Sequence, residues 1–402
     1  MHRTLFDNTQ PAVFVLDGNQ RTALAVVRSL GRRGIRVMVG ESTKQSLAGA
    51  SRYCWKQVIY PSPTDDPERF SAEVSRITRE NDIAVVLPMT DVTATIVLRH
   101  RSLLHDDALP FPSWESFDRL TNKCALAGHA ASLGVSIPAT ICIGSREELA
   151  LALDRIDFPA VVKSAHSKIW FQGAWVGTGV RYVRSRDELV AAVEETPWLG
   201  QAPVLIQQCI EGEGQGVFAL YDHGRPLAWF AHRRVREKPP SGGVSVLSES
   251  IPLLQQLRES TDKLLSSVGW HGVAMAEFKV SQDGQPYLIE VNGRFWGSLQ
   301  LAVDSGVDFP YLLYRLATGQ QVEPVTEFEI GRKCRWLFGD LDRLYLVMKG
   351  KQAGGMATKL RAVAEFLRLR EPGMRYEVNR FDDMKPFLVE LGNYIRAVAK
   401  KV

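Results

Sequence analysis

The first ninety residues alternate short apolar runs with segments of mixed polarity. Three apolar runs have the length and composition of buried strands, namely 12–17, 35–40 and 81–88. The segments at 18–34 and around 68–80 have helical spacing instead, the first of them after a turn. Strands that alternate with helices predict a parallel sheet of Rossmann type. The first turn lacks the GxGxxG pattern, which argues against dinucleotide binding there.

An Asp-Gly turn separates two apolar strands in the segment 276–298, and this pair of residues is a strong hairpin signal. Each strand carries one acid in an apolar setting, Glu277 and Glu290, and burying an unpaired carboxylate is costly. Asn292 lies on the same strand face as Glu290, and Arg294 continues that spacing. Because Mg²⁺ takes carboxylate and phosphate oxygens, this face predicts a magnesium–polyphosphate site.

A lysine ends another short apolar strand, at 158–164. Lys163 in such a setting costs stability unless it meets an anion, for which phosphate is the usual candidate. A Gly-rich segment follows at 173–179, with Gly177 and Gly179 in its second half. Glycine lets backbone N–H groups approach phosphate oxygens closely. An ordinary hairpin is the alternative for this loop.

Taken in chain order, these motifs resemble the ATP-grasp superfamily of the carboxylate–amine ligase type, over roughly residues 10–320. The resemblance implies ATP and Mg²⁺, with Mn²⁺ as an alternative ion. It implies that Glu277, Glu290 and Asn292 hold the metal. Arg294 is then the catalytic residue that stabilises charge on the transferred phosphoryl group.

The resemblance extends to a hinge at 204–214 and to a lysine that opens a helical run at 124–133. It implies nucleotide contacts from Lys123, Lys163, Gly177, Gly179, Gln207, Gln208, Ile210 and Glu213. The family commonly has Glu where Gln207 stands, but a Gln carbonyl oxygen can still accept from the adenine amino group. Glu213 is preferred over Glu211 as the ribose acid. Taken alone, the hinge segment is more typical of an edge strand that runs into a turn.

An arginine-rich strand and a Pro-Pro-Ser-Gly-Gly loop lie between the hinge and the acidic hairpin. Arginine recognises carboxylate and phosphate with paired donors, so this segment is the predicted place for an acidic substrate or its acyl phosphate. The predicted contacts are Arg236, Ser241, Gly242 and Gly243. Asp91 and Thr90, after an N-terminal strand, are further substrate candidates, although an N-cap for the next helix explains them equally well.

The expected fold class is α/β, with an α+β ATP-grasp core. The expected divisions are a Rossmann-like unit at 1–112, a small ATP-grasp subdomain at 113–190, a large one at 191–325, and a basic, mainly helical region at 326–402. Residues 331–402 hold 16 Lys/Arg against 8 Asp/Glu. This region could touch an acidic membrane or a nucleic acid, but a solvated face over a packed apolar stripe is preferred. Amphipathic helices are expected there at 353–369 and 382–402.

Composition and cysteine spacing narrow the class of protein further. A hydrophobic share of 45% and a charged share of 23% are those of an ordinary globular chain, without an apolar run long enough for a membrane span. The five cysteines are scattered and odd in number, at Cys54, Cys124, Cys142, Cys209 and Cys334. Their spacing argues against a disulfide framework or a zinc site, and with no signal peptide it favours the cytoplasm.

The resemblance implies an ATP-dependent ligase that joins a small carboxylate to an amine through an acyl phosphate, with ADP and phosphate released. No nucleic-acid partner is expected, and a homodimer is compatible with the resemblance. An ATP-grasp kinase and a non-catalytic ATP-binding protein remain as alternatives. An enzyme that uses bicarbonate is disfavoured, because nothing in the chain resembles the extra domains of the carbamoyl-phosphate and biotin-carboxylase types.

Overall fold

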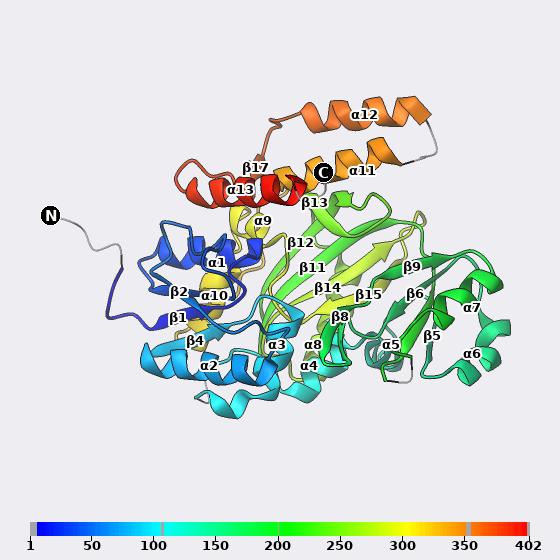
Figure 1. The fold of residues 1–402 in the computed structure, drawn as a ribbon, viewed down its shortest axis with the longest axis horizontal. Helices are drawn as coiled ribbons and strands as arrows, with labels where there is room; N and C mark the ends of the chain where they lie inside the picture. The colour runs from blue at the N-terminus through cyan, green and yellow to red at the C-terminus, as the bar shows by residue number, and fades with distance from the viewer. Residues whose placement is uncertain (1–5, 106–107, 200, 351–354, 400–402) are drawn as a thin grey trace.

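The computed structural model describes residues 6–105, 108–199, 201–350 and 355–399. Its strands form three larger sheets and one separate hairpin. In Figure 1 the large sheet occupies the centre, with the N-terminal unit on the left and the small sheet on the right. The last three helices lie above them.

The N-terminal unit is a parallel sheet in the order β3-β2-β1-β4. Its strands are β1 (Ala12–Val15), β2 (Val37–Glu41), β3 (Lys56–Ile59) and β4 (Ile83–Leu87). Its helices are α1 (Arg21–Gly31), α2 (Pro67–Glu80) and α3 (Asp91–Arg99), and a 3-10 turn follows at Arg101–Leu103. The near-continuous apolar runs of β1 and β4 match strands buried on both faces. The predicted Rossmann-like arrangement is confirmed.

The small sheet is antiparallel in the order β5-β10-β6-β9. Its strands are β5 (Thr140–Ile143), β6 (Ala160–Ser164), β9 (Val180–Val183) and β10 (Val204–Gln208), and β7 (Lys168–Phe171) and β8 (Ala174–Gly177) form the separate hairpin. The helices of this region are α4 (Trp114–Thr121), α5 (Lys123–Ser132), α6 (Arg146–Ala152), with a 3-10 turn at Leu153–Arg155, and α7 (Arg186–Glu194). Because β10 is a central strand, the small unit runs through residue 208. The expected boundary at 190 instead falls inside α7.

The large sheet has the order β15-β14-β11-β12-β13-β16-β17. Its strands are β11 (Glu213–Asp222), β12 (Arg225–Lys238), β13 (Val244–Ser250), β14 (Gly272–Val280), β15 (Pro286–Asn292), β16 (Lys333–Arg335) and β17 (Met374–Tyr376). Its helices are α8 (Gln255–Ser267), α9 (Leu299–Asp304) and α10 (Phe309–Ala317). The C-terminal region is therefore not only helical, since β16 and β17 extend this sheet.

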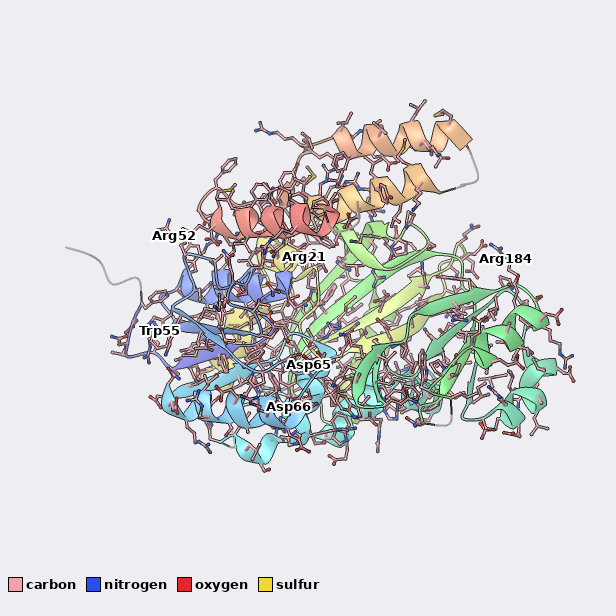
Figure 2. The ribbon with its side chains drawn as sticks, viewed as in Figure 1. Arg21, Arg52, Trp55, Asp65, Asp66 and Arg184 are labelled. Carbon is pink, nitrogen blue, oxygen red and sulfur yellow. A yellow bond between two sulfur atoms is a disulfide. The ribbon has the colours of Figure 1, made fainter. Side chains whose placement is uncertain are left out.

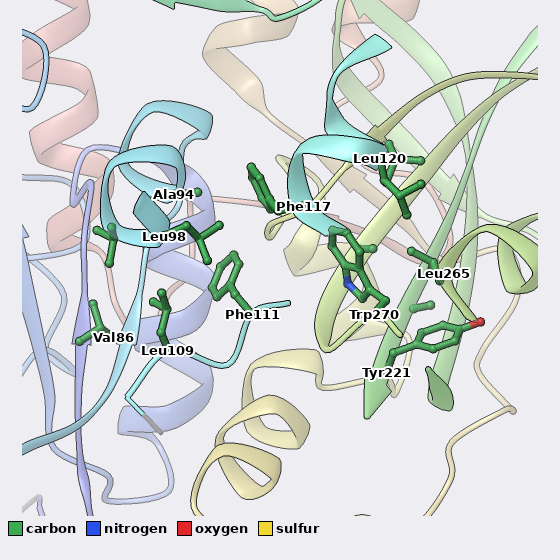
Figure 3. Close-up of a cluster of buried hydrophobic side chains, with 14 of the residues drawn as sticks. Val86, Ala94, Leu98, Leu109, Phe111, Phe117, Leu120, Tyr221, Leu265 and Trp270 are labelled. Carbon is green, nitrogen blue, oxygen red and sulfur yellow. The ribbon is translucent and has the colours of Figure 1, made fainter. Parts of the chain in front are cut away.

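One apolar cluster joins the N-terminal unit to the large sheet. Figure 3 follows it from Val86 and Leu98 through Phe117 to Trp270 and Tyr221. The rings of Phe117, on α4, and Trp270, before β14, are stacked with centroids 6.4 Å apart. This packing fixes α4, and with it the start of α5, against the strands that carry the candidate metal ligands.

The C-terminal helices are α11 (Leu337–Lys349), α12 (Gly355–Leu367) and α13 (Lys385–Ala399). Parts of the two predicted helices, at 353–354 and 400–402, lie outside the described residues. Arg21 and Arg52 lie along the interface between the N-terminal unit and this C-terminal region (Figure 2). Along it, Arg28 donates to Asp383 Oδ2 at 2.8 Å with both side chains almost fully buried.

The cysteine expectation is wrong in one respect, because Cys124 and Cys142 form a disulfide. Cys124 lies on α5 and Cys142 on β5, and the fold brings their Cα atoms to 6.0 Å, within the usual disulfide range. The other three cysteines are free. Among the helices of the described ranges, none has the length and hydropathy to cross a bilayer.

Candidate functional site

The acidic hairpin forms as predicted. β14 and β15 pair antiparallel, with Glu277 directly opposite Glu290, and Gly284 takes a positive φ of 84° in the turn. Both acids line a cavity of about 690 Å³ between the large and small sheets. Asn292 Nδ2 donates to Glu290 Oε1 at 3.3 Å, so the amide sits beside the second acid. The three predicted metal ligands are therefore brought together.

Two basic side chains pair with these acids inside the cavity. Lys123 Nζ lies 3.3 Å from Glu290 Oε2, and Arg234 Nη2 pairs with Glu277 Oε2. Arg234 reaches Glu277 across β11, where its side chain packs over Gly214 and its Cδ lies 3.4 Å from the position of a Cβ there. Arg234 is a site residue that the sequence reasoning missed.

Arg236, which the sequence singled out, lies outside this cavity. Strand alternation would place residues 232, 234 and 236 on one face, but a β-bulge follows Arg234, so that two residues oppose one on β13. The bulge turns Arg236 away, where its Nη2 lies 2.8 Å from Asp340 Oδ2 and its Nη1 donates to Glu365 O. It is 7% exposed. The predicted substrate contact is corrected to a buried link between β12 and the C-terminal helices.

The pKa values of the two acids are shifted in opposite directions. Burial raises the pKa of Glu277, although Arg234 opposes this. Burial acts the same way on Glu290, but Lys123, Lys163 and Arg234 outweigh it and lower its pKa. At least Glu290 is thus held as a carboxylate, the form that a hard cation needs. Two carboxylates beside an amide are a donor set that suits a hard cation such as Mg²⁺.

The two lysines that are predicted to face phosphate come from the ends of two elements. Lys123 opens α5, where Asn122 caps the helix by accepting from the N–H groups of Cys124 and Ala125. Lys163 lies near the end of β6, and both lysines line the cavity. From the Gly-rich segment Gly179 also lines it, with a φ of 63°, whereas Gly177 does not.

The pKa of Lys163 predicts a pH-dependent nucleotide affinity. Burial lowers this pKa to about 8, so the free protein loses the charge as pH rises through that value. We expect the Kd of an ATP analogue to rise about tenfold between pH 7 and pH 9, because one pKa unit corresponds to a tenfold population change. In Lys163→Arg the Kd should stay flat, since a guanidinium does not titrate there. Equal pH profiles for the two proteins would refute this role.

The predicted hinge lies along β10 and the turn after it. Gln207, Gln208 and Ile210 all line the cavity. Gln207 Nε2 donates to Thr140 Oγ1 at 2.8 Å, which orients the amide and leaves Oε1 as its acceptor. Glu213 lies outside the cavity lining, where its Oε2 pairs with Arg233 at 3.3 Å. The structure thus does not support Glu213 as the ribose acid.

A second cavity, of about 610 Å³, lies beside the first and shares Arg294, Gly297 and Val244 with it. Arg294 forms a bidentate pair with Asp91, at 2.7 and 3.0 Å, and donates to Asn292 Oδ1 at 3.2 Å. Asp91 lines this second cavity, and Thr90 is the N-cap of α3. The N-cap interpretation is thus confirmed for Thr90, which also lines the second cavity, and substrate contact by Asp91 stays a prediction.

The Ser-Gly-Gly loop borders the first cavity. Ser241, Gly242 and Gly243 all line it, and Tyr182 of the small sheet donates to Ser241 O at 3.2 Å. Gly243 lies so close to Lys238 O that a Cβ would come within 2.5 Å. The loop thus connects the two sheets over the space between them.

Sequence and structure comparisons agree with this architecture. A family model described as "ATP-grasp in the biosynthetic pathway with Ter operon" matches residues 201–338. No curated protein matches the chain. Among solved structures, the biotin carboxylase–ATP complex of Campylobacter jejuni has a TM-score of 0.64 at 15% identity, over 81% of this chain and 75% of that one.

Two further structures cover most of both chains. The L-amino acid ligase of Bacillus licheniformis has a TM-score of 0.61 at 19% identity, over 78% of each chain. The N5-carboxyaminoimidazole synthetase of Staphylococcus aureus, complexed with ADP, has a TM-score of 0.62 at 12% identity, over 82% of this chain and 83% of that one. Identities this low establish the fold and leave the reaction to be argued from the site.

Proposed function

The chain has the ATP-grasp fold, and on that premise we propose that it is an ATP-dependent ligase that joins a small carboxylate to an amine. The observation that carries the proposal is the pair of adjoining cavities that share Arg294. The first holds the paired acids and the lysines expected around Mg·ATP. The second offers room for other reactants at the edge of the first. The names of two structural neighbours, a ligase and a synthetase, support this reaction class.

In the proposed first step an oxygen of the substrate carboxylate attacks the γ-phosphorus. The bond between that phosphorus and the β–γ bridging oxygen breaks, so ADP leaves and an acyl phosphate remains. Glu277, Glu290 and Asn292 would hold Mg²⁺, which supplies charge neutralisation for the phosphates. Lys123 and Arg234, which pair with the acids in the free protein, would meet the phosphate oxygens together with Lys163. Arg294, fixed by Asp91, stabilises the charge on the transferred group.

In the second step the amine nitrogen attacks the acyl carbon, the bond between that carbon and the phosphate oxygen breaks, and the proton that the amine loses passes to the departing phosphate. The second cavity is where we place the acid and the amine. Its wall includes Arg21 and Lys168, and also Trp336 and Glu390 of the C-terminal region. Glu390 Oε1 accepts from Trp336 Nε1 at 2.7 Å, and this hydrogen bond holds the Glu390 carboxylate at the wall of the cavity. Cations and acids that face one space suit a zwitterionic reactant such as an amino acid.

The test is release of ADP and phosphate from Mg·ATP in the presence of amino acids and small carboxylic acids, singly and in pairs. We expect release to require an acid and an amine, with a product whose mass is their sum less one water. A phosphorylated product from a single substrate would favour a kinase. ATP binding without turnover across the panel would favour a protein that binds ATP without catalysis.

A further inference from the structure

A cluster of two histidines and one aspartate lies at the far end of the large sheet from the nucleotide cavity. Asp222 ends β11, His223 follows it in the turn to β12, and His271 precedes β14. The register pairs Tyr221 with Gly272 across β11 and β14, which sets Asp222 beside His271. Glu277 lies six positions after His271 along the strand, about 20 Å at the usual rise, so the cluster is distinct from the predicted magnesium site.

The three side chains converge on one point. His223 Nδ1 lies 2.8 Å and His271 Nδ1 lies 3.4 Å from the same oxygen, Asp222 Oδ1. The two imidazole rings face each other with centroids 4.2 Å apart. One candidate ligand atom from each residue lies within 4.8 Å of the other two.

Apart from this 3.4 Å approach to Asp222 Oδ1, the buried His271 Nδ1 has no polar partner among the described residues. A buried polar atom with only one long contact is poorly satisfied and requires an explanation. Zinc binds nitrogen and oxygen at about 2.0–2.2 Å in tetrahedral geometry, which separates neighbouring ligand atoms by about 3.3 Å. The spacing between His271 and Asp222 already has that value. The ring of His223, whose side chain is 78% exposed, has the freedom to complete the set.

Both segments that carry these residues are anchored. Each begins directly after a fully buried aromatic residue, Tyr221 in one case and Trp270 in the other (Figure 3). The N–H of Gly224 donates to Trp270 O at 2.8 Å, which ties the turn to the start of β14. The ligand positions are therefore held by the backbone, as a metal site requires.

From this geometry we propose that Asp222, His223 and His271 form a binding site for a divalent transition-metal ion of the zinc class. Two imidazoles and one carboxylate suit zinc and its first-row neighbours, whereas Mg²⁺ prefers oxygen ligands throughout. Three protein ligands leave a fourth position open on the exposed side of His223. The bound ion joins the β11–β12 turn to the start of β14 and so strengthens that end of the sheet. Arg225, whose Nη2 lies 3.8 Å from Asp222 Oδ2, competes for the carboxylate and moderates the affinity.

The experiment titrates the full-length, chelator-treated protein with Co²⁺ and Zn²⁺. A Glu290→Gln background disables the nucleotide-site acids, so one binding event is expected, with the visible absorption of histidine-ligated Co²⁺. His223→Ala and Asp222→Asn should each raise the Kd more than about 100-fold, because even groups that only hydrogen-bond a ligand are worth 10- to 100-fold. The matched control is His129→Ala, a histidine of α5 outside the cluster.

Zn²⁺ should also raise the melting temperature of the parent protein and not that of His223→Ala, because a ligand that binds only the folded state stabilises it. His223 is largely exposed, so its replacement leaves a folded protein in which the loss of binding can be read. Equal Co²⁺ affinities for the parent and both variants would overturn the proposal. So would the lack of any binding tighter than millimolar by the parent.

Discussion

Glu290→Gln is expected to reduce turnover about 1,000-fold while the protein stays folded. The substitution keeps the shape of the side chain and removes the charge that is proposed to hold the metal against the phosphates. Metal ions supply several kcal/mol of transition-state stabilisation, and about 4 kcal/mol corresponds to three factors of ten in rate. Steady-state release of ADP and phosphate from Mg·ATP measures the effect. The proposal assigns the neighbouring cations, which lower the pKa of Glu290 in the free protein, to the phosphates in the complex.

The matched control is Glu213→Gln on the same sheet. Glu213 lies outside the cavity lining and pairs with Arg233, so its neutralisation should change turnover and ATP affinity less than twofold. A Glu290→Gln protein with full activity would show that the paired acids do not hold the metal. A large rise in the KM for ATP in Glu213→Gln would instead restore that residue as the ribose acid.

Arg28→Ala is expected to cost about 3–5 kcal/mol of unfolding free energy. Removing one partner of a buried ion pair leaves the other charge uncompensated, and this is the measured range for such losses. Arg28 also donates to the carbonyls of Glu377, Val378 and Asp383, so the whole segment loses its anchor on α1. Urea unfolding followed by circular dichroism gives the change in free energy.

Arg32→Ala, at the C-cap of the same helix, serves as the control. Arg32 pairs with Asp382 at 2.5 Å, but both side chains are exposed by more than a third. An exposed pair is worth at most about 1 kcal/mol, so this variant should unfold almost as the parent does. Equal losses in the two variants would mean that the buried pair does not hold the C-terminal region in place.

Local patterns in the sequence predicted the elements that position the site. The Asp-Gly turn and the strand alternation place Glu277, Glu290 and Asn292 together as the structure has them. Lys163 could be recognised because a lysine in an apolar strand has few explanations. The parallel N-terminal sheet followed from its alternation of strands and helices. Each of these signals depends on residues close to one another in the chain.

What the sequence did not reveal depends on contacts between distant residues. The bulge after Arg234 reverses the faces of the arginine-rich strand, and no residue there signals it. β10 is central in the small sheet because it pairs with both β5 and β6, which lie earlier in the chain. Local patterns do not show these pairings, so the sequence placed the boundary between the small and large units too early, near 190. The disulfide partners are 18 residues apart and lie on a helix and a strand, which spacing alone does not pair.

The most direct test of the proposed reaction follows one oxygen atom. The carboxylate substrate is labelled with ¹⁸O, and the phosphate released during ligation is analysed by mass spectrometry. An acyl phosphate route transfers one labelled oxygen to each phosphate, because the bond that breaks in the second step lies between the acyl carbon and that oxygen. The amide product keeps one carboxylate oxygen on any route, so the other oxygen is the one to trace. Released phosphate that carries no label, with the lost oxygen found in water instead, would contradict the account.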